Sequence, residues 1–101
     1  EPTMRRFISG CREAGVRADT PMDSGRHIYT NWDPILNQRG AHNPAFDAYA
    51  LAGVPVEYSK DMCQNTLDVL SHTAYLYTDP TRERKDLDAM IAKVKAVAAE
   101  L

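Results

Sequence analysis

Side chains that could bind a polar ligand are concentrated in one irregular segment of the chain. These side chains lie in residues 29–42, mostly at the start of an irregular part that covers residues 31–58, and a long irregular segment inside a compact domain is more often functional than decorative. An aromatic ring can stack on a sugar, while amide, guanidinium and imidazole groups bond its hydroxyls. We therefore expect a site for a polar ligand such as a sugar, formed by Tyr29, Asn31, Trp32, Asn37, Arg39 and His42. The alternative is a surface loop with a partly buried Trp32.

No motif in the sequence would run a reaction by itself. There is no glycine-rich phosphate loop, no CxxC and no HExxH. The three histidines are isolated from one another and lack metal-ligand spacing to the cysteines. Lys60 follows Ser59, but neither residue has a visible activating neighbour, so we expect Lys60 at a helix edge or in an ion pair. We expect no catalytic residue and no metal site in this chain.

The composition is that of an ordinary globular domain with a weak net charge. The chain has 101 residues, of which 44% are hydrophobic and 26% charged, and a formal net charge of −2. A chain of this length can bury one core without disulfides, and its charge gives no reason to expect nucleic acid or an anionic membrane as a partner. The longest nearly apolar run, residues 48–56, is too short to cross a bilayer. We expect a single domain, residues 1–101.

The two cysteines indicate the cellular compartment of the chain, and its first residue indicates how its N-terminus arises. Cys11 and Cys63 each lie on the apolar face of an expected helix, which predicts two buried free thiols and a reducing, cytoplasmic location. The alternative is a Cys11–Cys63 disulfide, which requires that the two helices lie side by side. The chain begins with Glu1 rather than Met, already within an expected helix. This indicates a processed start or a piece of a longer protein.

Two helices are expected to frame the fold. The first covers residues 2–14 and stops at Gly15, and Gly10 within it costs about 1 kcal/mol relative to alanine. The closing helix begins near Asp79 or Thr81. Both helices carry apolar residues at helical spacing: Met4, Phe7, Ile8 and Cys11 in the first, and Leu87, Met90, Ile91, Val94, Ala98 and Leu101 in the last.

The elements between these helices are shorter. Residues 16–18 and 26–30 are predicted to form an antiparallel strand pair, and a helix over 61–71 leads into a further strand at 72–78. Isolated helical turns are expected in the irregular part, one begun at Asp33-Pro34 and one capped by Asn43. This order predicts an α+β fold, a two-layer sandwich in which the N- and C-terminal helices pack on one face of a small, mostly antiparallel sheet.

The closing third has the pattern of a known enzyme family. A helix start with an acidic residue and a cysteine leads to a leucine-rich turn, a short strand, an acidic proline-containing turn and an amphipathic last helix. The residues are Asp61-Met-Cys63 through Val69-Leu-Ser71, Ala74-Tyr-Leu-Tyr77, Thr78-Asp-Pro80 and Leu87-Asp-Ala-Met-Ile-Ala-Lys-Val94. This part resembles the C-terminal small domain of the DegT/StrS-type pyridoxal-phosphate-dependent aminotransferases, which aminate nucleotide sugars and cyclitols. Ala14-Gly15-Val16 is similar to the family's entry into its first small-domain strand.

The resemblance implies the small domain of a fold-type-I enzyme. The family's Schiff-base lysine, its acid partner for the pyridine nitrogen and its phosphate-binding groups lie in the large domain and have no match here. It therefore implies that pyridoxal phosphate is bound only in the complete enzyme, that this chain alone binds no cofactor and is inactive, and that its partner is the large cofactor-binding domain. A homodimer of the full protein is a further expectation. The segment around Tyr29 to His42 would line the substrate entrance.

A function from a different class fits the same residues. The chain could be a free-standing α+β protein-interaction module without catalysis, which would use the irregular segment or the basic first helix to bind its partner.

Overall fold

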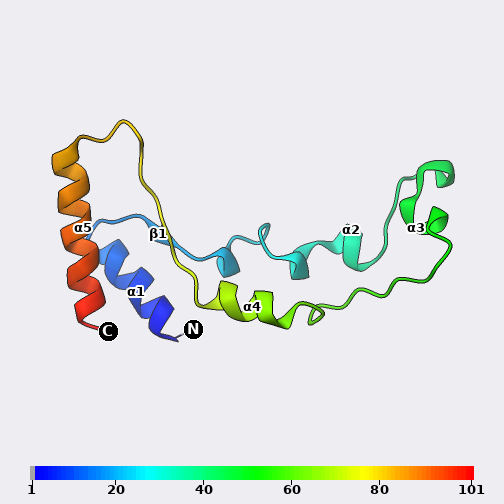
Figure 1. The fold of residues 1–101 in the computed structure, drawn as a ribbon, viewed down its shortest axis with the longest axis horizontal. Helices are drawn as coiled ribbons and strands as arrows, with labels where there is room; N and C mark the ends of the chain where they lie inside the picture. Colours follow the sequence, from blue (N-terminus) through cyan, green and yellow to red (C-terminus); the bar gives the residue numbers. More distant parts are fainter. Residues whose placement is uncertain (1) are drawn as a thin grey trace.

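The computed structural model describes residues 2–101 and shows an elongated chain (Figure 1). Its extents along the principal axes are 57, 31 and 17 Å, and its Cα radius of gyration is 19.6 Å. A compact domain of about 100 residues has a radius of gyration of about 13 Å. A helical end, where both ends of the chain lie, is joined to an arm formed by residues 24–63, which runs out and returns (Figure 1).

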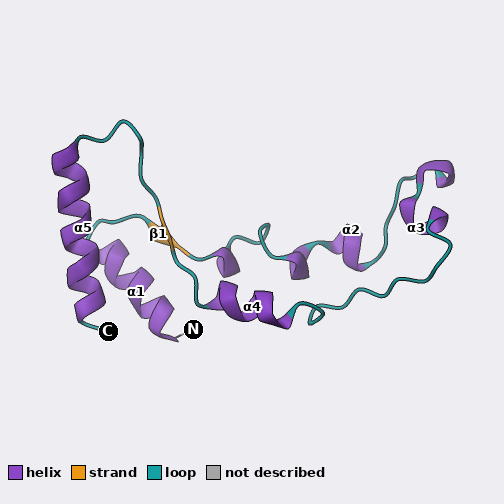
Figure 2. Ribbon diagram, in the orientation of Figure 1, coloured by secondary structure: helices purple, strands orange, loops and turns teal. Residues whose placement is uncertain are grey.

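The regular elements are short apart from the first and last helices. The α-helices are α1 (Pro2–Glu13), α2 (Asp33–Leu36), α3 (Ala48–Leu51), α4 (Gln64–Ser71) and α5 (Arg84–Ala99). The strands are β1 (Ala18–Asp19) and β2 (Tyr75–Leu76), and 3-10 helices occupy Pro21–Asp23, Tyr29–Asn31 and Pro44–Phe46. Figure 2 shows that helices and loops account for nearly all of the chain. Within residues 2–101, no helix is long and apolar enough to cross a membrane.

The first helix forms as the spacing of its apolar residues predicts. Met4, Ile8 and Cys11 are buried, Phe7 packs against them as a half-buried residue, and Gly15 follows the helix with a φ of +77°. Glycine adopts this left-handed conformation without the steric cost that a Cβ would add. The core that these residues begin is completed by Val16 and Ala18 after the helix, and by Ala74, Met90, Val94 and Val97 from the C-terminal part.

The last helix faces the core with a different set of residues from the predicted stripe. Leu87, Met90, Val94 and Val97 are half-buried, whereas Ile91 is 50% and Leu101 is 44% exposed. Ala98 is also exposed. The contact is narrow because α5 meets essentially one neighbour, α1, so only the side chains nearest the line between the two helices are covered. The prediction that Ile91, Ala98 and Leu101 belong to the buried stripe was therefore wrong.

The sheet is antiparallel, as predicted, but pairs different strands. Ala18 lies opposite Leu76 and Asp19 opposite Tyr75, so β1 pairs with β2. Residues 26–30 form no strand; they are bends followed by the 3-10 helix Tyr29–Asn31. Thr20 accepts a hydrogen bond from Met22 and caps the 3-10 helix that starts at Pro21, so the chain turns before it could fold back on β1. The expected pairing of 16–18 with 26–30 was wrong.

The fold is α+β, with a two-stranded antiparallel sheet beside two packed helices. Helix α1 contacts both α5 and β1, so the three elements form one cluster (Figure 2). Helix α4 packs beside the 3-10 helix Pro21–Asp23, and its Leu67 and Leu70 are half-buried. The thiol of Cys11 is buried as predicted, but Cys63 is exposed because it lies just before α4, at the base of the arm.

Gly10 lies on the side of α1 that faces Val97 of α5, and this contact explains why a residue with low helix propensity stands there. A Cβ atom at Gly10 would lie 2.7 Å from Cγ1 of Val97. That distance is far inside van der Waals contact, so any side chain at position 10 forces the two helices apart or moves Val97.

We expect Gly10→Ala to destabilise the chain although alanine is the better helix former. The gain in helix propensity is about 1 kcal/mol, and inserting a methyl group into a packed contact costs about 1–3 kcal/mol. In a Val97→Ala background the clash is removed, and Gly10→Ala becomes neutral or stabilising. Urea unfolding of the four chains of this double-mutant cycle measures the coupling. Stabilisation by Gly10→Ala with Val97 present would contradict the close helix approach.

Arg5 ties α1 to the turn that follows β1. Its two terminal nitrogens donate to the two carboxylate oxygens of Asp23 at 3.1 Å each. The hydrogen bond from Arg5 holds the pKa of Asp23 below its usual value. Because the folded-state pKa is depressed, the stabilisation is present above the unfolded-state pKa and is lost as the pH falls through the folded-state value.

We expect Arg5→Gln to raise the pKa of Asp23 toward that of an unperturbed aspartate. The measurement is an NMR titration of the Asp23 carboxyl carbon in both chains. Lys95→Gln, which removes a positive charge from α5 away from this pair, serves as the control and should leave the Asp23 titration unchanged. Equal effects of the two substitutions would show that the pair does not set this pKa.

Candidate functional site

Short helical turns position the predicted site residues along the outgoing limb of the arm. Pro34 stands in the first turn of α2, where its missing N–H costs no helical hydrogen bond. The expected turn at Asp33-Pro34 is confirmed, although the residue at the cap position is Trp32 and it makes no side-chain cap bond. The turn expected at Asn43 is also confirmed, since the Asn43 side chain accepts a hydrogen bond from the backbone N–H of Ala45 at 3.0 Å.

Asn31 and Trp32 lie together on a shallow groove of about 430 Å³. The other residues that line this groove are Gly25, Arg26, Pro34 and Ile35. The indole N–H of Trp32 donates to the carbonyl oxygen of Arg26 at 2.7 Å, and the side chain of Trp32 is 44% exposed. With its N–H occupied, Trp32 offers a ring face rather than a hydrogen-bond donor, which suits stacking on a flat or sugar-like surface.

Tyr29 is turned away from the groove and holds the base of the arm. Its hydroxyl donates to the carbonyl oxygen of Lys60 at 2.8 Å and accepts from the backbone N–H of Cys63 at 3.1 Å. The phenol therefore satisfies two backbone groups on the returning limb, and its hydrogen-bonding capacity is used within the chain.

Asn37, Arg39 and His42 lie further out on the arm and do not line the Trp32 groove. Asn37 ends α2, its backbone N–H bonding to the carbonyl oxygens of Asp33 and Ile35. Arg39 and His42 are exposed. The structure thus brings together two of the six predicted residues, Asn31 and Trp32.

Four residues of the groove, Gly25, Arg26, Pro34 and Ile35, were not among the predicted site residues. Arg26 and Ile35 flank Trp32 in the fold, but 26–30 had the composition of a strand, and Ile35 had no periodic partner. The one available signal was the proximity of Arg26 and Ile35 to Trp32 in the sequence.

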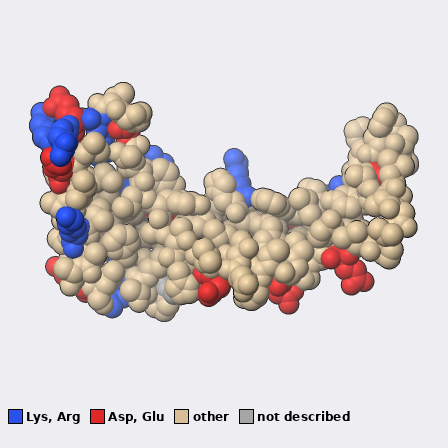
Figure 3. Space-filling view, in the orientation of Figure 1, with Lys and Arg blue, Asp and Glu red and all other residues tan. Residues whose placement is uncertain are grey.

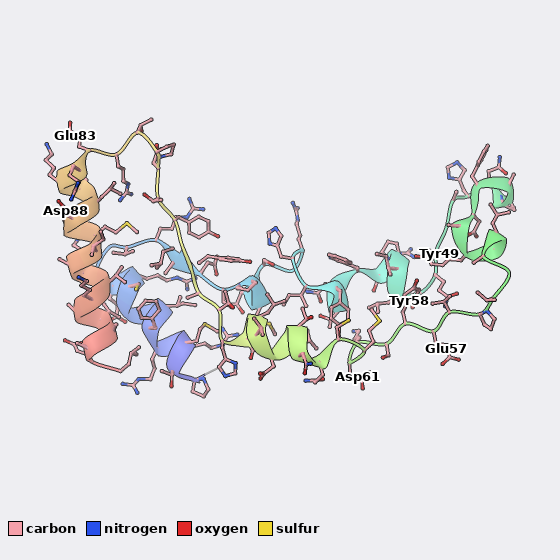
Figure 4. The ribbon with its side chains drawn as sticks, viewed as in Figure 1. Tyr49, Glu57, Tyr58, Asp61, Glu83 and Asp88 are labelled. Carbon is pink, nitrogen blue, oxygen red and sulfur yellow. The ribbon has the colours of Figure 1, made fainter. Side chains whose placement is uncertain are left out.

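Side chains rather than a backbone ladder hold the two limbs of the arm together. Tyr29 bonds across to Lys60 and Cys63, and the side-chain amide of Gln38 donates to the carbonyl oxygen of Val56. Near the tip, the rings of Tyr49 and Tyr58 meet edge to face with centroids 6.4 Å apart (Figure 4). A pair of this kind contributes about 0.5–1.5 kcal/mol.

A metal ion or pyridoxal phosphate would need particular side chains placed close together. Within residues 2–101, no group of three or more His, Cys, Asp and Glu side chains is placed to hold a metal ion. Lys60 is exposed at the base of the arm, and the groove around Trp32 contains no lysine and no acid that could pair with a pyridine nitrogen.

His72 occupies the cap position at the C-terminal end of α4. Its Nδ1 lies 2.8 Å from the carbonyl oxygen of Asp68 and 3.1 Å from the hydroxyl of Ser71. A donor at this position satisfies a carbonyl group that the helix leaves unpaired at its C-terminus.

Comparison with known proteins gives no relative from which a site could be transferred. No protein-family model matches the chain, and no curated protein or solved structure shows significant similarity to it.

We expect Tyr29→Phe to loosen the base of the arm without affecting the helical end. The substitution removes two hydrogen bonds, each with a net contribution of about 0.5–1.5 kcal/mol. Hydrogen exchange at the Cys63 amide should accelerate, while exchange at the amides of α1 should not change. Tyr75→Phe, which alters an exposed hydroxyl on β2, is the matched control. Unchanged protection of Cys63 would mean that Tyr29 does not hold the limbs together.

Proposed function

We propose that this chain is the C-terminal small domain of a pyridoxal-phosphate-dependent aminotransferase that acts on a nucleotide sugar or cyclitol. In this proposal the chain helps to form the substrate entrance and is inactive without the large cofactor-binding domain of the same enzyme. The full protein is a cytoplasmic homodimer. The observation that carries the proposal is the arm, whose surface needs a partner.

The arm has almost no interior of its own. Across residues 24–63, all of which the structure describes, Ile28 is the only buried hydrophobic residue. Apolar side chains at the tip are strongly exposed: Phe46 is 74%, Leu51 is 67% and Val54 is 64% exposed. Burial of a large apolar side chain stabilises a protein by about 1.5–3 kcal/mol, so covering this surface with another domain is strongly favoured.

The distribution of charge supports the same partner. Lys, Arg, Asp and Glu gather at the helical end, around α5, whereas the visible surface of the arm is mostly uncharged (Figure 3). Surfaces buried in stable interfaces are depleted of charge at their centre. The arm is therefore the part of this chain best suited to lie against the large domain, with the groove at Trp32 facing the entrance.

The family assignment itself rests on the sequence pattern of the closing third, which supplies the helix, strand and helix order of α4, β2 and α5. In the complete enzyme, α1 and α5 would cover one face of the β1–β2 sheet as one layer of a two-layer sandwich. The cofactor would be held entirely by residues of the large domain, and this chain would contribute Asn31 and Trp32 to the substrate side.

The alternative, a free-standing α+β interaction module, uses the same exposed arm. The coding sequence immediately upstream of the Glu1 codon separates the two functions. A cofactor-binding domain in the same reading frame supports the aminotransferase, and a start codon at that position supports the module.

We expect Leu51→Asp to disrupt assembly with the large domain, because it places a charge in the surface that must be buried. The measurement is recovery of aminotransferase activity and of a single assembled species when the chain is joined to its upstream domain. Ile91→Asp is the control, since Ile91 is also an exposed apolar residue, 50% exposed against 67% for Leu51, but lies on α5, outside the arm.

The isolated chain should give no internal-aldimine absorbance with pyridoxal phosphate. An absorbance band that Lys60→Ala abolishes would overturn the proposal, since it would place the Schiff-base lysine within this chain.

Full assembly of the Leu51→Asp protein with the large domain would show that the arm is not the interface.

A further inference from the structure

A pocket of about 300 Å³ lies between the turn that ends α1 and the N-terminal half of α5. The polar and backbone groups of its wall come from three parts of the chain that are distant in sequence. They are Gly15 and Arg17 after α1, Tyr77 after β2, and Arg82, Asp86 and Lys93 before and within α5.

The pocket concentrates positive charge on a chain whose net charge is negative. Its wall holds three cations, Arg17, Arg82 and Lys93, and one carboxylate, Asp86, while the chain as a whole carries −2. Within residues 2–101, none of the three cations forms an ion pair. Unpaired cations that face one pocket repel each other, and a bound anion would relieve that repulsion.

The other acids near this end of α5 are already occupied. Glu83 pairs with Lys85 at 2.8 Å and Asp88 pairs with Arg84 at 3.2 Å. Glu83 and Asp88 lie along the outer edge of the helix in Figure 4, and none of these four residues lines the pocket. Asp79, just before α5, accepts hydrogen bonds from Thr81 that lower its pKa, and the charge of Arg82 contributes to lowering the pKa of Asp79. Asp86 is the acid that lines the pocket together with the three cations.

The backbone holds two of the pocket residues in place. The N–H of Tyr77 donates to the carbonyl oxygen of Arg17 at 3.1 Å, which continues the strand pairing by one bond. The guanidinium carbon of Arg17 lies 4.4 Å from the centroid of the Tyr77 ring. This stacking orients the guanidinium in advance, so less side-chain entropy is lost when it binds a ligand.

Gly15 lies beside the third cation. Its φ of +77° ends α1, and a Cβ atom at this position would lie 3.8 Å from the ammonium nitrogen of Lys93. The ammonium group of Lys93 therefore lies next to the backbone of Gly15 at the pocket wall.

We propose that this pocket binds the dianionic phosphate group of a small molecule. Two guanidinium groups and one ammonium supply several N–H donors for phosphate oxygens, and guanidinium forks match phosphate geometry in pairs. A wall with three cations and one carboxylate balances a dianion, and the volume of the pocket accommodates a phosphate with a small body attached. The inference stands independently of the proposed aminotransferase function, because it uses no residue of the arm.

The test is a titration of the full chain with inorganic phosphate at constant ionic strength, followed by amide NMR shifts. We expect saturable shifts at Gly15, Tyr77 and Ala89. Lys93→Gln should weaken binding about fivefold or more, since a charge pair at contact distance is worth about 1 kcal/mol even in high dielectric. Lys95→Gln removes the same charge from the same helix outside the pocket and should leave the affinity unchanged.

A second pair of variants changes the affinity in the opposite direction. Asp86→Asn removes the one carboxylate of the pocket and should tighten phosphate binding, whereas Asp88→Asn, outside the pocket, should not. Thermal unfolding of each variant confirms that the fold is retained. Titration with acetate separates a phosphate site from a general carboxylate site, and we expect acetate to bind more weakly.

Several results would overturn the proposal. These are an absence of saturable shifts with phosphate, equal weakening by Lys93→Gln and Lys95→Gln, weaker binding by the Asp86→Asn chain, or acetate binding as tight as that of phosphate. None of these results bears on the upstream reading frame or on assembly through the arm, so failure here is distinguishable from failure of the proposed function.

Discussion

The packing of α1 against α5 is the contact on which the ordered end of the molecule depends. Each strand of the sheet has only two residues, too few to stay paired without support. Chain connectivity places β1 shortly after α1 and β2 shortly before α5, so the helix pair brings the strands together. The helices can approach closely because position 10 has no side chain, and Val97 fills the space. Glycine at position 10 therefore lowers the helix propensity of α1 but favours the packing of α1 against α5.

The arm is stabilised by a different kind of interaction. Its limbs are linked by polar side chains and one aromatic pair, each of which contributes little in water. Fixing the backbone costs about 1–2 kcal/mol per residue, and the arm gains little burial within the chain to offset that cost. Segments with few buried contacts open most readily. The helical end contains the buried core of the chain, whereas the arm has little buried surface to stabilise it.

Sequence reasoning succeeded where structure is decided locally and failed where it is decided by distant residues. The spacing of Met4, Ile8 and Cys11, the proline at the start of α2 and the cap at Asn43 each act within a few residues. The partner of Ala18 could not be found this way, because Leu76 lies far along the chain and the nearer segment 26–30 looked equally suitable. At the site, Asn31 and Trp32 line the same groove because they are adjacent in the sequence. The hydrogen bond from Tyr29 to Lys60 could not be predicted, because no repeating pattern of residues indicates the turn that directs Tyr29 toward Lys60.

The pairing of Ala18 with Leu76 closes a loop that contains the entire arm. The entropy lost on closing a loop grows only with the logarithm of its length, so doubling the loop costs about 0.6 kcal/mol. Near the tip, Gly53 has a φ of +68°, and a Cβ atom there would meet nothing within 4 Å. Insertions or deletions at the tip would therefore change the reach of the arm at little thermodynamic cost to the helical end. The length of this one loop can therefore vary while the core residues stay unchanged.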